Sequence, residues 1–398
     1  MPISVSISKT SRSRASARVI ELRAAIVFAA AVALAGCAGG NANLRAGSGI
    51  DDLMRDYAGA VPGASVLVLR NGAPLVRRSY GLASVEDKSA ASPQTNYRLA
   101  SLTKQFTASA ILLLAEDGKL TLDDRARRWL PTLPAAADAI TIRHLLTHSG
   151  GLIDYEDIIP GHIGPESPAT PAAQTSPSAL PPTSAEVVED PSKQLRDIDV
   201  LHLLEKTDHL YFAPGTNYRY SNGGYSMLAL IVEKASGETF QDFLRRRIFE
   251  PLGMHDTLAY VRGGPAVPHR AYGYAFENGS WVRTDQSLTS AVLGDGGVYS
   301  SIDDLAKWDA AAYDNRLLGD ASRRLAVTPW TQTDDPNVRY GFGIRLSGDT
   351  QWHSGETIGF RNVMVRWPQQ RLTVIVLTNR DDPEPYRLAL KIADRFRQ

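Results

Sequence analysis

The chain has 398 residues but only one cysteine, Cys37, so no disulfide can form within it. Lysine plus arginine and aspartate plus glutamate both number 43, so the chain lacks the excess of one charge that favours nucleic acid as a partner. It also lacks the HExxH, CxxC and P-loop patterns, and it has no G-x-S-x-G nucleophile elbow. We therefore expect neither a metal nor an organic cofactor.

The only long apolar run near the amino terminus, at 24–35, is too short to cross a bilayer as a helix, which takes about 20 residues. Basic residues precede the run, and this order is typical of a signal peptide. The run ends in Leu34-Ala35-Gly36-Cys37, which resembles a bacterial lipobox. The resemblance implies that Cys37 receives lipid and begins the mature protein. An ordinary secretory signal cut near Ala38 is the alternative.

We thus expect an exported protein, anchored to the lipid bilayer through acylated Cys37, at the outer membrane facing the periplasm. The chain divides by composition and pattern into a signal peptide, a tether and one domain that carries a helical lobe and a proline-rich insertion. We expect the signal peptide at 1–36, the tether at 37–50 and the domain at 51–398. Within the domain, the helical lobe spans about 99–252 and the proline-rich insertion about 158–197.

Apolar runs at both ends of the domain predict strands. Two runs flank Asn71-Gly72, which is a strong hairpin signal, and two more flank a Pro-Gln-Gln turn at 368–370. A helical tail follows at 385–396, and helical spacing of apolar residues fills the middle of the chain, at 101–117, 142–147, 200–206 and 224–235. The pattern predicts the α/β (α+β) class, with an antiparallel sheet flanked by terminal helices and an inserted helical lobe.

Eight prolines lie among alanine, serine and threonine between Pro160 and Pro191. This composition cannot build a core, so we expect an exposed insertion. A lid over a cleft is the alternative.

Ser101 and Lys104 form a Ser-x-x-Lys quartet at the start of an apolar helical segment. A serine hydroxyl is a poor nucleophile until a neighbour takes its proton, and a lysine can do so when burial keeps it neutral. Residues i and i+3 share a helix face, so Lys104 is placed to activate Ser101. The pattern is weak alone, since Ser6 and Lys9 repeat it. Ser101 could instead be a helix cap, with Lys104 extending to solvent.

Two further segments supply partners for the quartet. Tyr220 and Asn222 open another apolar helix, where a phenol can act as general acid or base and an amide can orient the lysine or a substrate carbonyl. His353 opens His-Ser-Gly on an expected strand, from which a side chain and a backbone N–H can reach a substrate. We treat Tyr313 with Asn315, and His148 with Gly150, as coincidental repeats of these patterns.

Six segments in order resemble the signatures of the penicillin-recognising serine hydrolases, in the class C β-lactamase-related branch that includes esterases and D-amino-acid peptidases. They span about 53–380 and read RLASLTKQFTA, RHLLTHSGGLIDY, APGTNYRYSNGGYSMLALIVEKASG, PLGMHDT, GDGGVYSSIDDLAKW and WHSGETIGF. The resemblance implies a β-lactamase/transpeptidase-like fold and an acyl-enzyme mechanism without cofactors.

Position by position, the resemblance implies a nucleophile, its activator and a general base, and it assigns substrate and oxyanion contacts to four further residues. The catalytic set is Ser101, Lys104 and Tyr220, and the binding set is Asn222, His353, Gly355 and Glu356. The backbone N–H groups of Ser101 and Glu356 would form the oxyanion hole.

One departure from the family pattern concerns His353, because β-lactamases of this type have a lysine there. Histidine is mostly neutral near pH 7 by its reference pKa, so it should hold a substrate carboxylate more weakly. We therefore expect a hydrolase of carboxylic esters or of D-amino-acid peptides and amides. A β-lactamase or D-alanyl-D-alanine carboxypeptidase is one alternative, and a catalytically silent module that binds cell-wall fragments or penicillin is another. An envelope protein that interacts through the proline-rich segment is a third.

Overall fold

The computed structural model describes residues 49–159, 193–381 and 385–397. The chain divides into a unit of residues 1–52 and a unit of residues 53–398, and the sheet and the helical lobe belong to the second unit. The expected signal peptide, Cys37 and most of the proline-rich insertion lie outside the described residues. Within the described ranges, no helix combines the length and apolar character that a membrane span requires.

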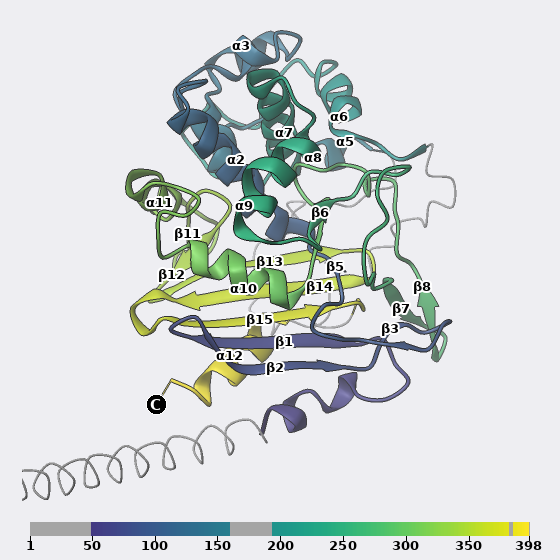
Figure 1. Cartoon of the computed structure of the whole chain (residues 1–398). Coiled ribbons are helices and arrows are strands. Elements are labelled where there is room, and N and C mark those ends of the chain that lie inside the picture. Colours follow the sequence, from purple (N-terminus) through teal and green to yellow (C-terminus); the bar gives the residue numbers. More distant parts are fainter. Residues whose placement is uncertain (1–48, 160–192, 382–384, 398) are drawn as a thin grey trace, which may run out of the picture. The chain divides into compact units, whose positions relative to one another are not determined.

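The framework is an eight-stranded antiparallel sheet, with the strand order β10-β11-β12-β13-β14-β15-β1-β2 (Figure 1). The strands are β1 Ala64–Arg70, β2 Ala73–Tyr80, β10 Thr331–Gln332, β11 Arg339–Tyr340, β12 Arg345–Ser347, β13 Thr350–Thr357, β14 Phe360–Trp367 and β15 Leu372–Thr378. Asn71 and Gly72 join β1 to β2 with φ values of 52° and 78°, as a two-residue hairpin turn requires. The first and last strands of the expected pattern thus meet, because β1 pairs with β15.

Both faces of the central strands are buried. Ile375 and Leu377 on β15 belong to the main core together with residues of the helical lobe. Side chains alternate along a strand, so the buried Val374 and Val376 point to the opposite face. Helix α12 (Tyr386–Asp394) contacts β14 and β15, as the predicted terminal helix should.

The helical lobe lies between the two sets of strands in the sequence and beyond one side of the sheet in space (Figure 1). Its helices are α2 Lys104–Glu116, α3 Ala126–Trp129, α4 Ile142–Leu146, α5 Tyr155–Ile158, α6 Asp197–Leu204, α7 Asn222–Ser236, α8 Phe240–Leu244 and α9 Glu250–Leu252, with the turns η2 Ala100–Thr103, η3 Ala135–Ala139 and η5 Arg245–Phe249. The predicted fold, an antiparallel sheet with terminal helices and an inserted helical lobe, is confirmed.

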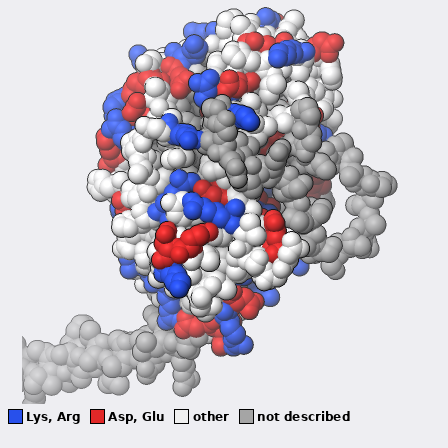
Figure 2. All heavy atoms as spheres, turned by 90° about the vertical axis from the view of Figure 1, so that its right-hand side faces the viewer, with Lys and Arg blue, Asp and Glu red and all other residues white. Residues whose placement is uncertain are grey.

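Shorter elements complete the unit. They are η1 Arg55–Tyr57, β3 Leu82–Ser84, β4 Ser89–Ala90, β5 Tyr97–Arg98, β6 Leu258–Ala259, β7 Tyr274–Glu277, β8 Ser280–Arg283, β9 Val298–Ser300, α10 Ile302–Ala311, α11 Asp320–Ala326 and η6 Pro368–Gln370. Helix α10 contacts β1 and β15. On the face shown in Figure 2, basic and acidic side chains of the described residues are interspersed, and neither sign covers a continuous surface there.

Helix α2 is central to the lobe because it is buried from Lys104 through Leu114. A helix that is apolar all round can be satisfied only inside a core. It contacts α7 on one side and α11 on another. This burial fixes the position of the residues at its first turn, where the candidate site lies.

Candidate active site

Ser101 lies on a tight 3₁₀ turn, η2, and the α-helix begins three residues later, at Lys104. The prediction of one helix from Ser101 onward was therefore wrong for its first turn. Residues i and i+3 of a 3₁₀ turn eclipse each other, so Ser101 and Lys104 still share a face. Ala100, just before the serine, has φ 50°, which is uncommon for a residue with a side chain.

Strand β13 holds this turn in place through Gly355. A Cβ added there would lie 2.0 Å from the carbonyl oxygen of Leu99 and 3.2 Å from the backbone nitrogen of Leu102. Only glycine permits such a close approach between backbones. Gly355 thus brings β13, and with it the next residue, Glu356, against the turn that carries Ser101. The oxyanion role of the Ser101 and Glu356 N–H groups stays a prediction.

Lys104 is fully buried, and its ammonium group points at three oxygens. Its Nζ donates to Ser101 Oγ at 3.0 Å, to Asn222 Oδ1 at 2.7 Å and to the carbonyl oxygen of Asp295 at 3.0 Å. The alternative in which Lys104 extends to solvent is therefore wrong. None of the three acceptors is a carboxylate oxygen, so none of these three hydrogen bonds is to a group that carries a full negative charge.

Burial lowers the pKa of Lys104 from 10.5 to about 8. The negative charges of Asp295, Glu156 and Asp154 raise it and offset part of this effect. At pH 7 about one lysine in ten is then neutral. A neutral amine keeps two N–H donors for Asn222 and Asp295, and its lone pair can accept the Ser101 proton.

The amide of Asn222 is oriented by one hydrogen-bond donor and one acceptor. Its Oδ1 accepts from Lys104, and its Nδ2 donates to Glu156 Oε2 at 2.9 Å. These two bonds assign the oxygen and nitrogen without ambiguity. Asn222 is the first residue of α7, which Ser221 caps by accepting from the Gly224 N–H. The sequence thus predicted the contact between Asn222 and the lysine, but it did not reveal Glu156.

Buried carboxyl groups surround the lysine. Asp295 accepts a hydrogen bond from the Tyr155 hydroxyl at 2.9 Å, and burial raises its pKa to about 7. Burial likewise raises the pKa of Asp154 to about 6, although the backbone N–H groups of Glu156 and Gly223 donate to it. Among the residues that the structure describes, no three histidine, cysteine or acidic side chains are arranged to hold a metal ion.

Tyr220 lies over the lysine, with its ring centroid 4.8 Å from Lys104 Nζ. It is supported by His148, whose ring centroid lies 4.3 Å from that of Tyr220. The Ser221 N–H donates to His148 Nδ1 at 3.1 Å, which fixes the histidine relative to the start of α7. Burial lowers the pKa of His148 well below 6.5, so it is neutral. His148 lies just after α4 and on no strand, so it does not form the strand motif that His353 carries, as predicted. Its contacts with Tyr220 and with Ser221 were not expected from the sequence.

His353 is buried, and both of its ring nitrogens have partners within the protein. Nδ1 lies 2.6 Å from the Ser354 carbonyl oxygen, so it must donate, and Nε2 then accepts from the Tyr340 hydroxyl at 2.9 Å. Burial lowers the pKa of His353 well below 6.5. In this arrangement His353 has no nitrogen left for a substrate, so the geometry does not support its expected role as a direct, weak ligand of carboxylates.

A positive charge reaches the same place from the neighbouring strand β12. The guanidinium carbon of Arg345 lies 5.5 Å from the ring centroid of Tyr220 and 5.9 Å from that of Tyr340. Its charge contributes to the lowered pKa of His353 and of Lys104. No local pattern marks Arg345, because it lies on β12 while the His-Ser-Gly motif lies on β13.

The fold and this serine-lysine pair define the class as a serine hydrolase, and comparison with known proteins agrees. The chain belongs to the beta-lactamase family, whose model matches residues 50–397. It is 32% identical to penicillin-binding protein 4* of Bacillus subtilis over 83% of this chain and 71% of that protein. It is 29% identical to a D-aminopeptidase of Gluconobacter oxydans over 80% of this chain, which spans only 56% of the relative's length.

Solved structures give the same picture. A penicillin-binding protein from Bacillus halodurans superposes with a TM-score of 0.70 at 25% identity, over 87% of this chain and 98% of that one. The octameric penicillin-binding protein homologue from Pyrococcus abyssi gives 0.69 at 26% identity, over 87% of this chain and 76% of that one. The fold predicted from the six segments is thus confirmed.

Proposed function

We propose that the chain hydrolyses carboxylic esters or D-amino-acid peptides and amides through an acyl-enzyme on Ser101. The observation that carries the proposal is the 3.0 Å hydrogen bond between Lys104 Nζ and Ser101 Oγ, made by a fully buried lysine whose pKa is lowered to about 8. A buried amine with such a pKa can be neutral near physiological pH, and only the neutral amine accepts a proton.

The reaction proceeds in two balanced halves. Ser101 Oγ attacks the carbonyl carbon, and its proton passes to neutral Lys104, directly or through the Tyr220 hydroxyl. The bond from the carbonyl carbon to the leaving oxygen or nitrogen then breaks. The leaving group takes a proton from the Tyr220 hydroxyl while Lys104 returns its proton to Tyr220, so that an alcohol or amine departs and both side chains regain their starting states. Water then attacks the acyl-enzyme by the same route, which releases the carboxylic acid and restores Ser101.

The choice of substrate rests on two observations. The name of the D-aminopeptidase relative supports D-amino-acid peptides and amides as substrates. Arg345, near the Tyr220 ring, supplies a fixed positive charge that His353 does not, and arginine pairs readily with carboxylates. A substrate with a carboxylate near the scissile bond, as in a D-alanyl-D-alanine peptide or a β-lactam, is therefore the second candidate.

The test is acylation of the full chain by a p-nitrophenyl ester, followed by stopped-flow absorbance and by mass spectrometry of the Ser101 peptide. We expect a burst of p-nitrophenol and an acyl adduct on Ser101, both lost in Ser101→Ala. Ser280→Ala, on the exposed strand β8, is the control and should keep both. A burst that survives in Ser101→Ala would reject the proposed nucleophile.

The two substrate candidates are separated by a D-dipeptide and its carboxy-terminal amide. If Arg345 binds a carboxylate, Arg345→Met should raise KM for the free acid at least tenfold and leave the amide unchanged. Equal effects on both substrates would exclude this role of Arg345, and hydrolysis of the amide alone would favour an aminopeptidase or amidase.

We also propose, from the sequence pattern alone, that the protein is exported and lipid-anchored through Cys37. Cell fractionation tests this directly, since Cys37→Ala should move the protein from the membrane fraction to the soluble fraction. Retention of Cys37→Ala in the membrane would reject the anchor.

A further inference from the structure

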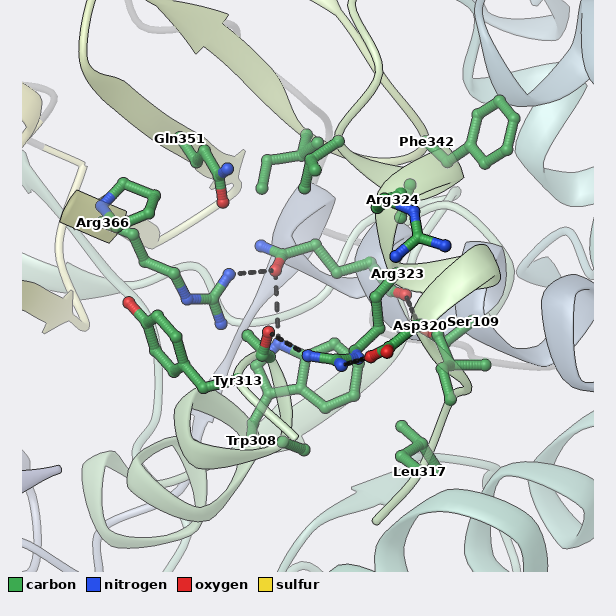
Figure 3. A pocket seen from close by; sticks show the side chains of 18 residues that line it. Ser109, Trp308, Tyr313, Leu317, Asp320, Arg323, Arg324, Phe342, Gln351 and Arg366 are labelled. Carbon is green, nitrogen blue, oxygen red and sulfur yellow. Dashed lines mark hydrogen bonds and ion pairs between the residues drawn. The ribbon is translucent and has the colours of Figure 1, made fainter. Parts of the chain in front are cut away.

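A cavity of about 350 Å³ lies on the side of α2 that bears Gln105 and Ser109 (Figure 3). Its remaining walls come from α10, α11, β13 and β14 and from the segments 312–318, 342–344 and Pro368. Ligand pockets begin at about 300 Å³, and an engineered apolar cavity of about 150 Å³ already holds benzene. The cavity is therefore large enough for a small organic molecule.

The polar end of the cavity contains a buried arginine with an unmade hydrogen bond. Arg366 Nε donates to Asp309 Oδ1 at 2.6 Å, and its Nη1 donates to Gln105 Oε1 at 3.4 Å. Its Nη2 is buried and has no hydrogen-bond partner among the described residues. A buried donor without a partner destabilises the fold, so we expect such a group to bind an acceptor. In Figure 3 the labelled Arg366 side chain extends toward the middle of the group of lining side chains.

The apolar lining and the charges of the cavity indicate which kind of ligand fits it. Trp308, Leu318 and Phe342 are among the apolar residues that line it, and three arginines but one aspartate, Asp320, line it as well. Asp309 pairs with Arg366 and Asp320 pairs with Arg323, so two of these three positive charges are already offset. One net positive charge is left at the cavity, which favours a ligand with one negative charge over a dianion.

We propose that this cavity binds a small amphipathic monocarboxylate, with its carboxylate at Arg366 and Gln105 and its apolar chain against Trp308 and Phe342. No step of the proposed catalysis uses these residues. The binding is therefore independent of Ser101 and of the proposed function, and it should persist in Ser101→Ala. Water can satisfy the polar end of the cavity, but Trp308, Leu318 and Phe342 offer it no hydrogen-bond partners, so a ligand with an apolar chain fills the cavity better than water alone.

The test is isothermal titration of the full chain with octanoate, and with octanamide and acetate as matched probes. We expect saturable binding of one octanoate, with octanamide weaker by at least tenfold because it lacks the charge, and acetate weaker because it lacks the chain. Failure of octanoate to bind, or equal binding of octanamide, would overturn the proposal.

Two variants locate the binding. Gln351 pairs with Arg366 across β13 and β14 and lines the cavity, so Gln351→Glu places a competing carboxylate beside Arg366 and should weaken octanoate at least tenfold. Gln351→Lys is its matched control and should bind at least as tightly as the unmodified chain. Ala312→Trp, at an exposed position of the lining, should block entry and leave ester hydrolysis unchanged. If neither Gln351→Glu nor Ala312→Trp changes the affinity for octanoate, octanoate binds elsewhere, for example near Ser101, and the proposal is overturned.

Discussion

Two buried cations, Lys104 and Arg366, lie on either side of the same helix start and have opposite chemistry. Lys104 donates only to uncharged oxygens, and burial lowers its pKa to about 8. Arg366 donates to the carboxylate of Asp309 at 2.6 Å, and Asp309 also accepts from Thr373 at 3.0 Å. Burial beside neutral acceptors favours the neutral form of a lysine, whereas the charge of a buried guanidinium is compensated by pairing with a carboxylate.

The surroundings of Lys104 and those of Arg366 meet at two adjacent residues, Lys104 and Gln105. Lys104 faces Ser101 and Asn222. The next residue, Gln105, accepts from both Trp308 Nε1 at 3.2 Å and Arg366 Nη1. Successive residues on a helix point about 100° apart, so one turn serves both surroundings. We therefore expect substitutions around Lys104 to change mainly the rate of hydrolysis. Substitutions around Gln105 and Arg366 should change mainly the free energy of unfolding.

The largest effect is expected for Lys104→Met. Removal of the proton acceptor should lower kcat/KM for a p-nitrophenyl ester by about 10³-fold, within the range of general acid–base contributions. The melting temperature should stay the same or rise, because the charged form of a lysine with a lowered pKa is disfavoured by folding. A large fall in the melting temperature of Lys104→Met would show that Lys104 stabilises the fold, as Arg366 does, and would contradict this contrast.

Arg366→Met should have the converse effect. It leaves the Asp309 carboxylate buried without its cation, so the free energy of unfolding in urea should fall by about 3–5 kcal/mol. The kcat/KM of the folded fraction should change less than threefold. The double variant Arg366→Met with Asp309→Leu serves as control and should recover much of the stability.

A smaller loss of stability is expected for Gln105→Leu. The change removes the shared acceptor of Trp308 and Arg366, which should cost about 1–3 kcal/mol in chemical denaturation. Activity should remain, since the side chain faces away from Ser101. A large loss of kcat in folded Gln105→Leu would show that the two regions are coupled.

The smallest effect is a pH shift in Glu156→Gln. The negative charge of Glu156 raises the pKa of Lys104, so its removal should lower that pKa further and move the midpoint of the kcat/KM profile to lower pH, by about half a unit. Glutamine keeps an acceptor for Asn222 Nδ2. Asp157→Asn is the matched control, because Asp157 pairs with Arg219 and is not among the charges that shift Lys104. A shift to higher pH would contradict the account.

Local sequence was enough for the hairpin at Asn71-Gly72 and for the helices α2, α4, α6, α7 and α12, because turn chemistry and apolar spacing are short-range signals. Ser101, Lys104 and Asn222 were expected together and are joined by hydrogen bonds. Tyr220 was also found, and its ring does lie beside the lysine.

The remaining residues depend on contacts that no local pattern contains. Glu156 reaches Asn222 across 66 positions, and the Asp295 carbonyl reaches Lys104 across 191. The burial of His353 could not be predicted because Tyr340, which satisfies its Nε2, is on another strand. His148 is not part of the strand motif, as predicted, but its packing against the Tyr220 ring joins segments 72 positions apart and has no local signal.

The most direct test of the central claim is the titration of Lys104 itself. In the full chain with lysine labelled at ¹³Cε, the Lys104 resonance, assigned by its loss in Lys104→Met, should titrate with a pKa of about 8. A midpoint near the ordinary lysine value of 10.5 would mean that the buried amine stays charged at neutral pH, and Lys104 would then not be the group that activates Ser101.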